Sequence, residues 1–287
     1  MDDTETDGTL LVAVGNARTS ERLLDTATDI AADRSYRILI VHVVEVPAQI
    51  PLSEGDALLE EDDREVLARA EELVEGTDVP VDTVTRYTRD TATGIVSGAE
   101  EHGANLILMG WHGRPPRRDI VLGSYLDTVL RNAPCDVLVK RIRTPQADDV
   151  EAVLVPVANG PHARFATQVG GAIARHHDAQ LTLLHVLSDD ATDAERETGN
   201  ELLERAEADL EGVSVERIVD EGDHISGRIT DATTRHDVTI LGASEQSLLR
   251  RKLIGTVSEA VGRNAAGTVM IAQRHPSATF REESLSE

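Results

Sequence analysis

A glycine-rich segment at residues 110–124 has the residue types and spacing of a phosphate-binding loop. Gly110 and Gly113 are followed, after nine residues, by the pair Gly123-Ser124. A glycine at the end of a buried strand lets a backbone approach a ligand closely. A Gly-Ser pair at a helix start presents unpaired N–H groups and the positive end of the helix dipole to an anion. The spacing differs from that of a Walker loop and of G-x-G-x-x-G. It predicts a phosphate cradle at the carboxyl end of a parallel strand.

The same segment concentrates positive charge in an acidic chain. Arg114, Arg117 and Arg118 stand against the single Asp119, whereas the whole chain has a formal net charge of −24. Local positive charge in so acidic a protein favours an anionic ligand, with an arginine such as Arg114 neutralising a phosphate. Solvated loop charge is the alternative. His112, in the same loop, is a further candidate ligand contact.

The chain is a tandem duplication. Apolar runs at 10–14 and 39–43 recur at 153–157 and 182–186, an offset of 143 residues. The offset falls to 136 where Arg-Ala-Glu at 69–71 recurs at 205–207, and to 132 at the glycine motif. Most of the shortening of the second copy therefore follows its second strand.

The second glycine motif carries one change that opposes phosphate. Gly242 and the pair Gly255-Thr256 repeat the first motif, but Glu245 stands where a second glycine is expected. Like charges about 4 Å apart cost about 1 kcal/mol in water and about 4 kcal/mol in a partly buried site. The sequence therefore predicts a degenerate second site, with Gly242 and Gly255-Thr256 kept as structural turn residues.

Length and composition set the remaining limits. A chain of 287 residues favours two domains, and the repeat places the joint near 144–150. No apolar stretch is long enough to span a bilayer, and the acidic start does not resemble a signal sequence. The single cysteine, Cys135, fits a reducing cytoplasm and is expected to be a small core residue. The acidic, lysine-poor composition predicts a salt-adapted cytoplasmic protein and argues against nucleic-acid binding.

Apolar and amphipathic stretches alternate strictly in both copies, which predicts a doubly wound α/β sheet in each. The expected strands are 10–14, 36–43, 80–86, 105–110 and 136–141, then 151–157, 180–187, 213–220, 237–242 and 267–273. The expected helices are 18–33, 56–76, 92–102 and 124–132, then 162–177, 193–211, 224–236 and 256–264. In such sheets ligands bind beyond the carboxyl ends of the strands, where the glycine motif lies.

These features together resemble the universal stress protein family. The resemblance rests on the first strand, the strand ending His42-Val43, the glycine motif and the closing run A-P-C-D-V-L-V at 133–139. It implies two α/β domains, 8–143 and 150–274, each a five-stranded parallel sheet of order 3-2-1-4-5 with helices on both faces. It also implies an ATP or AMP site, with Mg²⁺ as companion of the nucleotide and no tightly bound metal. Residues 275–287 are expected to form a disordered tail.

The family also pairs its domains through their fifth strands. Here 137–140 and 269–272 are expected to pair within one chain, giving an intramolecular pseudo-dimer, with a homodimer as a further option.

Carried over residue by residue, the resemblance assigns phosphate contacts to Gly110, Gly113, Gly123 and Ser124. Val43 matches the valine that lies near the adenine, and Val186 is its counterpart in the second copy. Nucleotide-binding members carry an aspartate directly after the first strand. Here that position is Gly15 followed by Asn16, and in the second copy Ala158 followed by Asn159. Either asparagine could hydrogen-bond a ribose or a base.

Three functions follow from this comparison. The first is an adenine-nucleotide-binding regulatory module with one competent site, in the first copy. The second is a ligand-independent interaction protein, a regulatory partner of an amino-acid transporter, since the second copy is similar to degenerate tandem domains fused to amino-acid permeases. The third is a very slow ATP hydrolase, although no signature of an adenylyl-transfer enzyme and no catalytic triad occurs. His42 and His185 are expected to be packed core residues, and the pair His176-His177 completes no metal set.

Overall fold

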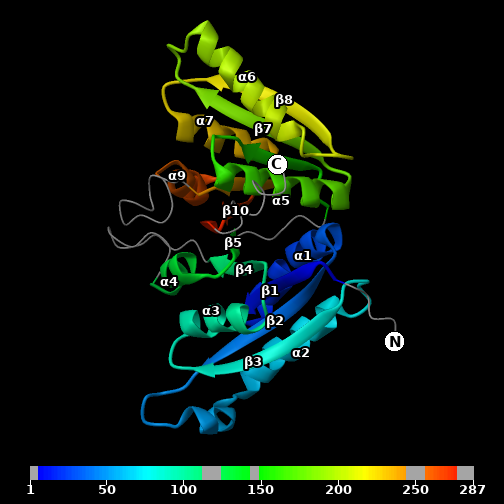
Figure 1. The fold of residues 1–287 in the computed structure, drawn as a ribbon, viewed down its shortest axis with the longest axis vertical. Helices are drawn as coiled ribbons and strands as arrows, with labels where there is room; N and C mark the ends of the chain where they lie inside the picture. The colour runs from blue at the N-terminus through cyan, green and yellow to red at the C-terminus, as the bar shows by residue number, and fades with distance from the viewer. Residues whose placement is uncertain (1–5, 112–123, 143–148, 244–255, 277–287) are drawn as a thin grey trace. The chain divides into compact units, whose positions relative to one another are not determined.

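A computed structural model describes residues 6–111, 124–142, 149–243 and 256–276, and its elements fall into two compact units that follow the two copies. In the first copy the order is β1 (Gly8–Val14), α1 (Ala17–Arg34), β2 (Tyr36–Glu45), the 3-10 helix η1 (Leu52–Leu58), α2 (Glu61–Val74), β3 (Val81–Thr88), α3 (Thr91–Glu101), β4 (Leu106–Trp111), α4 (Ser124–Asn132) and β5 (Asp136–Arg141). The five strands are parallel and lie in the order β3-β2-β1-β4-β5 (Figure 1).

The second copy repeats this arrangement. It contains β6 (Ala152–Pro156), α5 (Pro161–His177), β7 (Gln180–Leu187), α6 (Asp193–Glu207), β8 (Ser214–Glu221), α7 (Ile225–Ala232), the 3-10 helix η2 (Thr233–Arg235), β9 (Val238–Gly242), α9 (Thr256–Asn264) and β10 (Thr268–Gln273). Its parallel strands lie in the order β8-β7-β6-β9-β10. Both sheets therefore confirm the predicted order 3-2-1-4-5.

Helices cover both faces of each sheet because the central strands are apolar on both sides. In the second copy, residues Leu154, Leu184 and Leu241 pack in one cluster with side chains of α7 and α9. A Cβ added at Gly170 of α5 would lie 2.6 Å from Val155, which faces the opposite way. In the first copy α1 packs against α2, and α3 against α4.

Local signals position the helices at the carboxyl edges of the strands. The Asn16 side chain accepts a hydrogen bond of 3.0 Å from the Thr19 N–H and caps α1, and Asp90 caps α3 in the same way through Thr93. Pro161 begins α5, where the missing N–H has no helical partner to lose. Ser35 and Asp178 end α1 and α5 in left-handed conformations, with φ of 53° and 54°.

The structure refines two of the predicted helices. The expected helix 56–76 is two elements, η1 and α2, and the expected helix 224–236 is divided between α7 and η2. The shortening after the second strand is also visible: residues 46–60 join β2 to α2, whereas only 188–192 join β7 to α6.

Candidate functional site

Gly15 follows β1 at the carboxyl edge of the first sheet. Among the residues that the structure describes, none would lie within 4 Å of a Cβ built at Gly15, which does not have a positive φ. Within the described structure, the position therefore has room for the aspartate that the resemblance noted above leads us to expect there. The side-chain oxygen of the neighbouring Asn16 accepts the hydrogen bond that caps α1, and its amide N–H groups are the donors that could meet a ribose or base.

The strand that precedes the glycine loop is held on both sides. Gly110 pairs with Lys140 of β5, and its carbonyl accepts a 2.9 Å hydrogen bond from the Tyr125 hydroxyl of α4. A Cβ at Gly110 would lie 3.0 Å from Ile142. This crowding gives Gly110 a packing role. Val43, on β2, is half-buried and packs on α3, where a Cβ at Gly94 would lie 2.7 Å from it.

The helix that follows the loop begins at the position predicted from the sequence. Helix α4 starts at Ser124, and α9 starts at Thr256 in the second copy. The predicted contacts His112, Gly113, Arg114 and Gly123 lie outside the described residues, as do Glu245 and Gly255. The side chains of Ser124 and Thr256 are also outside the described part. Their roles stay predictions.

His42 at the end of β2 is buried, as expected, but it is also the centre of a polar contact that the sequence analysis missed. Its Nδ1 lies 3.1 Å from the Val14 carbonyl oxygen, and its Nε2 lies 2.8 Å from a carboxylate oxygen of Asp63 on α2. The Val14 carbonyl and an ionised Asp63 are both acceptors, so each contact is a hydrogen bond only when the ring nitrogen that faces it carries a proton. Asp63 also accepts from the Glu60 N–H. Burial raises the pKa of Asp63, but hydrogen bonds from Glu60 and His42 hold that pKa below its ordinary value.

The repeat contains a signal that could have found this contact. At the offset of 136 residues, Asp63 corresponds to Gly199. In the second copy His185 Nδ1 lies 2.8 Å from the Val157 carbonyl, as in the first. A Cβ at Gly199 would lie 2.9 Å from the His185 ring. Among the residues that the structure describes, none bonds to His185 Nε2.

The carboxyl edge of the second sheet contains a cavity of about 430 Å³. It lies beyond β6, β7 and β9 and beside α7 and α9, at the position where a doubly wound sheet binds its ligand. Of the residues predicted for the second site, Asn159, Val186 and Gly242 line it together with Ala158. The structure thus brings these four residues together.

Gly242 has a packing role in that edge. A Cβ there would lie 2.8 Å from the backbone nitrogen of Ala163, in the first turn of α5. The Gly242 carbonyl accepts a 3.0 Å hydrogen bond from the Ser258 hydroxyl of α9. This close approach agrees with the structural role expected for Gly242.

Cys135 is buried, and burial, with the nearby Asp136 carboxylate, raises its pKa to about 12, which fits the expected core role. Within the described ranges no three His, Cys, Asp or Glu side chains are grouped to hold a metal ion. No helix in those ranges combines the length and the apolar character that crossing a bilayer requires.

The model of the universal stress protein family matches residues 8–141 and 150–273, one match for each copy. The chain belongs to the universal stress protein family. The two matches confirm the tandem organisation predicted from the repeat.

The chain is also similar to one curated protein and to two solved structures. A Na(+)/H(+) antiporter NhaS5 of Synechocystis sp. is 28% identical over 180 residues, which is 62% of this chain but only 26% of the antiporter. The crystal structure of a universal stress protein from Archaeoglobus fulgidus has a TM-score of 0.66 at 17% identity, covering 95% of this chain and 98% of that one. The cytoplasmic domain of a prokaryotic cation chloride cotransporter has a TM-score of 0.58 at 11% identity, covering 92% and 95%.

Proposed function

We propose that this universal stress protein is a regulatory module that binds an adenine nucleotide, mainly in its first copy. The observation that carries the proposal is the carboxyl edge of the first sheet. There β1 ends next to Gly15, which no described residue crowds, β4 ends beside Gly110, and α4 begins at Ser124. A helix N-terminus facing such an edge offers backbone N–H groups to a phosphate.

Residues 112–123 join these two elements and supply the glycines and arginines of the predicted cradle. The second copy replaces one of those glycines by Glu245, so we assign the phosphate-binding role to the first. The proposed contacts are Gly110, Gly113, Gly123, Ser124 and Arg114, with Val43 near the base.

Gly113→Glu tests this assignment because it copies the acidic residue of the second motif into the first. Repulsion of about 1–4 kcal/mol between carboxylate and phosphate should weaken ATP or AMP binding roughly five- to thousandfold, measured by calorimetry on the full chain. Asn132→Glu is the matched control, since it adds the same charge at the exposed far end of α4. Equal affinity of wild type and Gly113→Glu would refute the proposal.

The reciprocal Glu245→Gly should improve nucleotide binding in the second copy. If the double variant Gly113→Glu with Glu245→Gly keeps the wild-type affinity, the bound nucleotide belongs to the second copy. Release of ADP in the same samples would reveal the slow hydrolase.

A second function is favoured by the antiporter relative. A protein of this fold that is part of an ion antiporter suggests that this chain regulates a membrane transporter without a ligand of its own. Mass spectrometry of the purified protein separates the two functions. A co-purified nucleotide supports the first, whereas a ligand-free protein with no calorimetric response to ATP or AMP favours the second.

A further inference from the structure

Each copy ties the carbonyl of its strand-end glycine to the first turn of the helix that follows. In the first copy the Tyr125 hydroxyl of α4 donates to the Gly110 carbonyl at 2.9 Å. In the second copy the Ser258 hydroxyl of α9 donates to the Gly242 carbonyl at 3.0 Å. The two glycines correspond at the offset of 132 residues, so the bond is made at the same place in both sheets. We call this bond the hydroxyl bridge.

The residues that donate in the two bridges are not equivalent. At the same offset, Tyr125 corresponds to Val257, and Ser258 corresponds to Leu126, which is a buried core residue. Tyr125 stands one position earlier in its helix than the serine. Its longer side chain can still reach the strand, because helical side chains lean toward the N-terminus of the helix. Since different residues form the same bond in the two copies, the bond itself is the common feature of this edge.

The Gly110 carbonyl points toward the boundary between β1 and β4. The next carbonyl along β4, that of Trp111, accepts a 2.9 Å hydrogen bond from the N–H of Ile142, which follows β5. Successive carbonyls of an extended strand point to opposite neighbours, so the Gly110 carbonyl points to the other side, toward β1. In the order β3-β2-β1-β4-β5 this boundary is the switch point, where doubly wound sheets bind their ligands.

An uncovered carbonyl at this boundary would oppose a phosphate, because its oxygen carries partial negative charge. The Tyr125 hydroxyl covers that oxygen. Partial burial raises the pKa of Tyr125, so the hydroxyl stays protonated and remains a donor. The bond also holds the first turn of α4 on the end of β4, and the N–H groups of a first turn have no partner within their own helix. The hydroxyl bridge therefore masks a repulsive group and fixes the direction of attractive ones.

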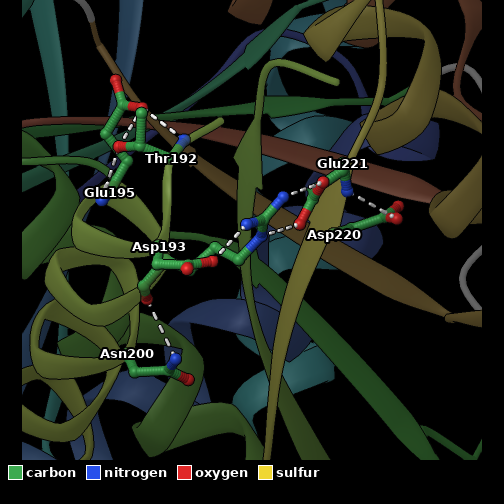
Figure 2. A network of polar contacts seen from close by, with 7 residues as sticks. Thr192, Asp193, Glu195, Asn200, Asp220 and Glu221 are labelled. Carbon is green, nitrogen blue, oxygen red and sulfur yellow. Dashed lines mark hydrogen bonds and ion pairs between the residues drawn. The ribbon is translucent and has the colours of Figure 1, made fainter. Parts of the chain in front are cut away.

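The start of α6 is joined to a strand end in a different way (Figure 2). Arg196, in the first turn of α6, donates to Glu221 at the end of β8 at 2.6 Å and 3.1 Å, and to Asp193 at 2.8 Å. That joint brings two carboxylates together with the arginine. The hydroxyl bridge joins α4 to β4 through an uncharged donor, so it adds no carboxylate at the boundary where a phosphate is expected.

We propose that Tyr125 is a positioning residue of the nucleotide site in the first copy, which acts on the phosphate end of the ligand by binding the Gly110 carbonyl and fixing the start of α4. This role rests on the nucleotide-binding function proposed above. It adds to that site a side chain that the glycine motif does not include. Tyr125 acts through Gly110 and α4, and no contact between its ring and the nucleotide is required.

The test compares AMP with adenosine, which lacks the phosphate, by calorimetry on the full chain in molar salt. Tyr125→Phe keeps the ring and removes only the hydroxyl. Its affinity for AMP should fall roughly three- to tenfold, the range for one hydrogen bond. Its affinity for adenosine should change by less than about twofold. A hydroxyl that only stabilised the fold would change both affinities alike.

Ser258→Ala is the matched control, because it removes the same bond from the second copy. Urea unfolding should show a similar loss of stability in Tyr125→Phe and Ser258→Ala. Only Tyr125→Phe should weaken the binding of AMP.

Three results would overturn the positioning role: Tyr125→Phe binds AMP as tightly as wild type, it loses AMP and adenosine affinity equally, or Ser258→Ala weakens AMP binding to the same extent. The nucleotide-binding function has a separate test in Gly113→Glu. If Gly113→Glu weakens AMP binding and Tyr125→Phe does not, the function stands and only the role of Tyr125 is refuted. If the wild-type chain binds no adenine nucleotide, both are refuted.

Discussion

The two copies keep the same histidine at the end of the second strand but give it different surroundings. In the first copy His42 connects the carboxyl end of β1 to the first turn of α2 through Val14 and Asp63. In the second copy His185 keeps the bond to β6 and rests against Gly199 of α6. One helix position is aspartate in the first copy and glycine in the second. Its residue type decides whether the histidine also forms a side-chain contact with the helix.

The comparison separates the histidine contact that both copies keep from the one that only the first copy has. The strand contact is common to both copies because it satisfies a backbone carbonyl at the sheet edge. The helix contact is copy-specific, and it accompanies the longer connection of residues 46–60.

The largest expected effect is that of salt on stability, and it should be the same in both copies. Residues 8–143 carry 23 acidic and 15 basic side chains, and residues 150–274 carry 20 and 12, so each copy has a net charge of −8. Self-repulsion should unfold both copies at low salt and be screened in molar salt, where the Debye length is about 3 Å. Melting followed by circular dichroism should show a strong rise of Tm with salt in a single transition. A Tm that does not move between ~0.1 M and molar salt would contradict it.

Asp63→Ala should break the comparison by making the first copy resemble the second. It removes the His42 contact and the bond to the Glu60 N–H, and it leaves a buried ring nitrogen without its acceptor. The expected loss is about 1–3 kcal/mol of unfolding free energy, measured by urea unfolding in molar salt. Asp62→Ala, at an exposed position of the same helical turn, should cost no more than about 0.5 kcal/mol. A similar loss of unfolding free energy in both variants would show that the effect comes from removing any carboxylate from the first turn of α2, and not from the contact with His42.

The pH dependence of this contact has a defined sign. Because the folded pKa of Asp63 is lowered, its contribution to stability is present above the ordinary aspartate pKa and is lost as pH falls through the lower folded value. The deficit of Asp63→Ala relative to wild type should therefore be full at pH 6 and shrink below about pH 4. A deficit that stays constant down to about pH 3 would exclude ionised Asp63 as its source.

The fold could be predicted from the sequence because each apolar run that indicates a strand in the first copy recurs in the second copy. Both sheet orders agree with the order that the family resemblance implies, and the starts of α4 and α9 agree with the prediction from the glycine motif. The division of the expected helix 56–76 into η1 and α2 was not predicted, since Pro51 and Gly55 lie in a region with no counterpart in the second copy.

The site was less accessible to sequence reasoning because side-chain contacts between distant elements leave no periodic signal. His42 was correctly expected to be buried, yet its partner Asp63 lies 21 residues further along the chain on a charged helix start. The cavity depends in the same way on α7, whose Ile225 and Ile229 belong to no recognised motif. Positions at which the two copies carry different residues, such as Asp63 and Gly199, are the sequence signal that can point to such contacts.

Gly199→Asp makes the converse change and should have the smallest effect. The new Cβ would lie 2.9 Å from the His185 ring, so the imidazole must shift and weaken its 2.8 Å bond to the Val157 carbonyl. Aspartate also gains a little over glycine in helix propensity, which limits the net loss to about 1 kcal/mol at pH 8.

The new carboxylate should also offer an acceptor to His185 Nε2 and recover part of that loss. Gly199→Ala introduces the same Cβ without the carboxylate. Urea unfolding of the two variants therefore separates the steric cost of the Cβ from the effect of the new contact. A loss in Gly199→Asp that exceeds the loss in Gly199→Ala by the full difference in helix propensity, about 0.7 kcal/mol, would mean that the carboxylate does not reach His185. In that case the longer connection in the first copy, rather than the aspartate alone, is what brings its second-strand histidine and its helix together.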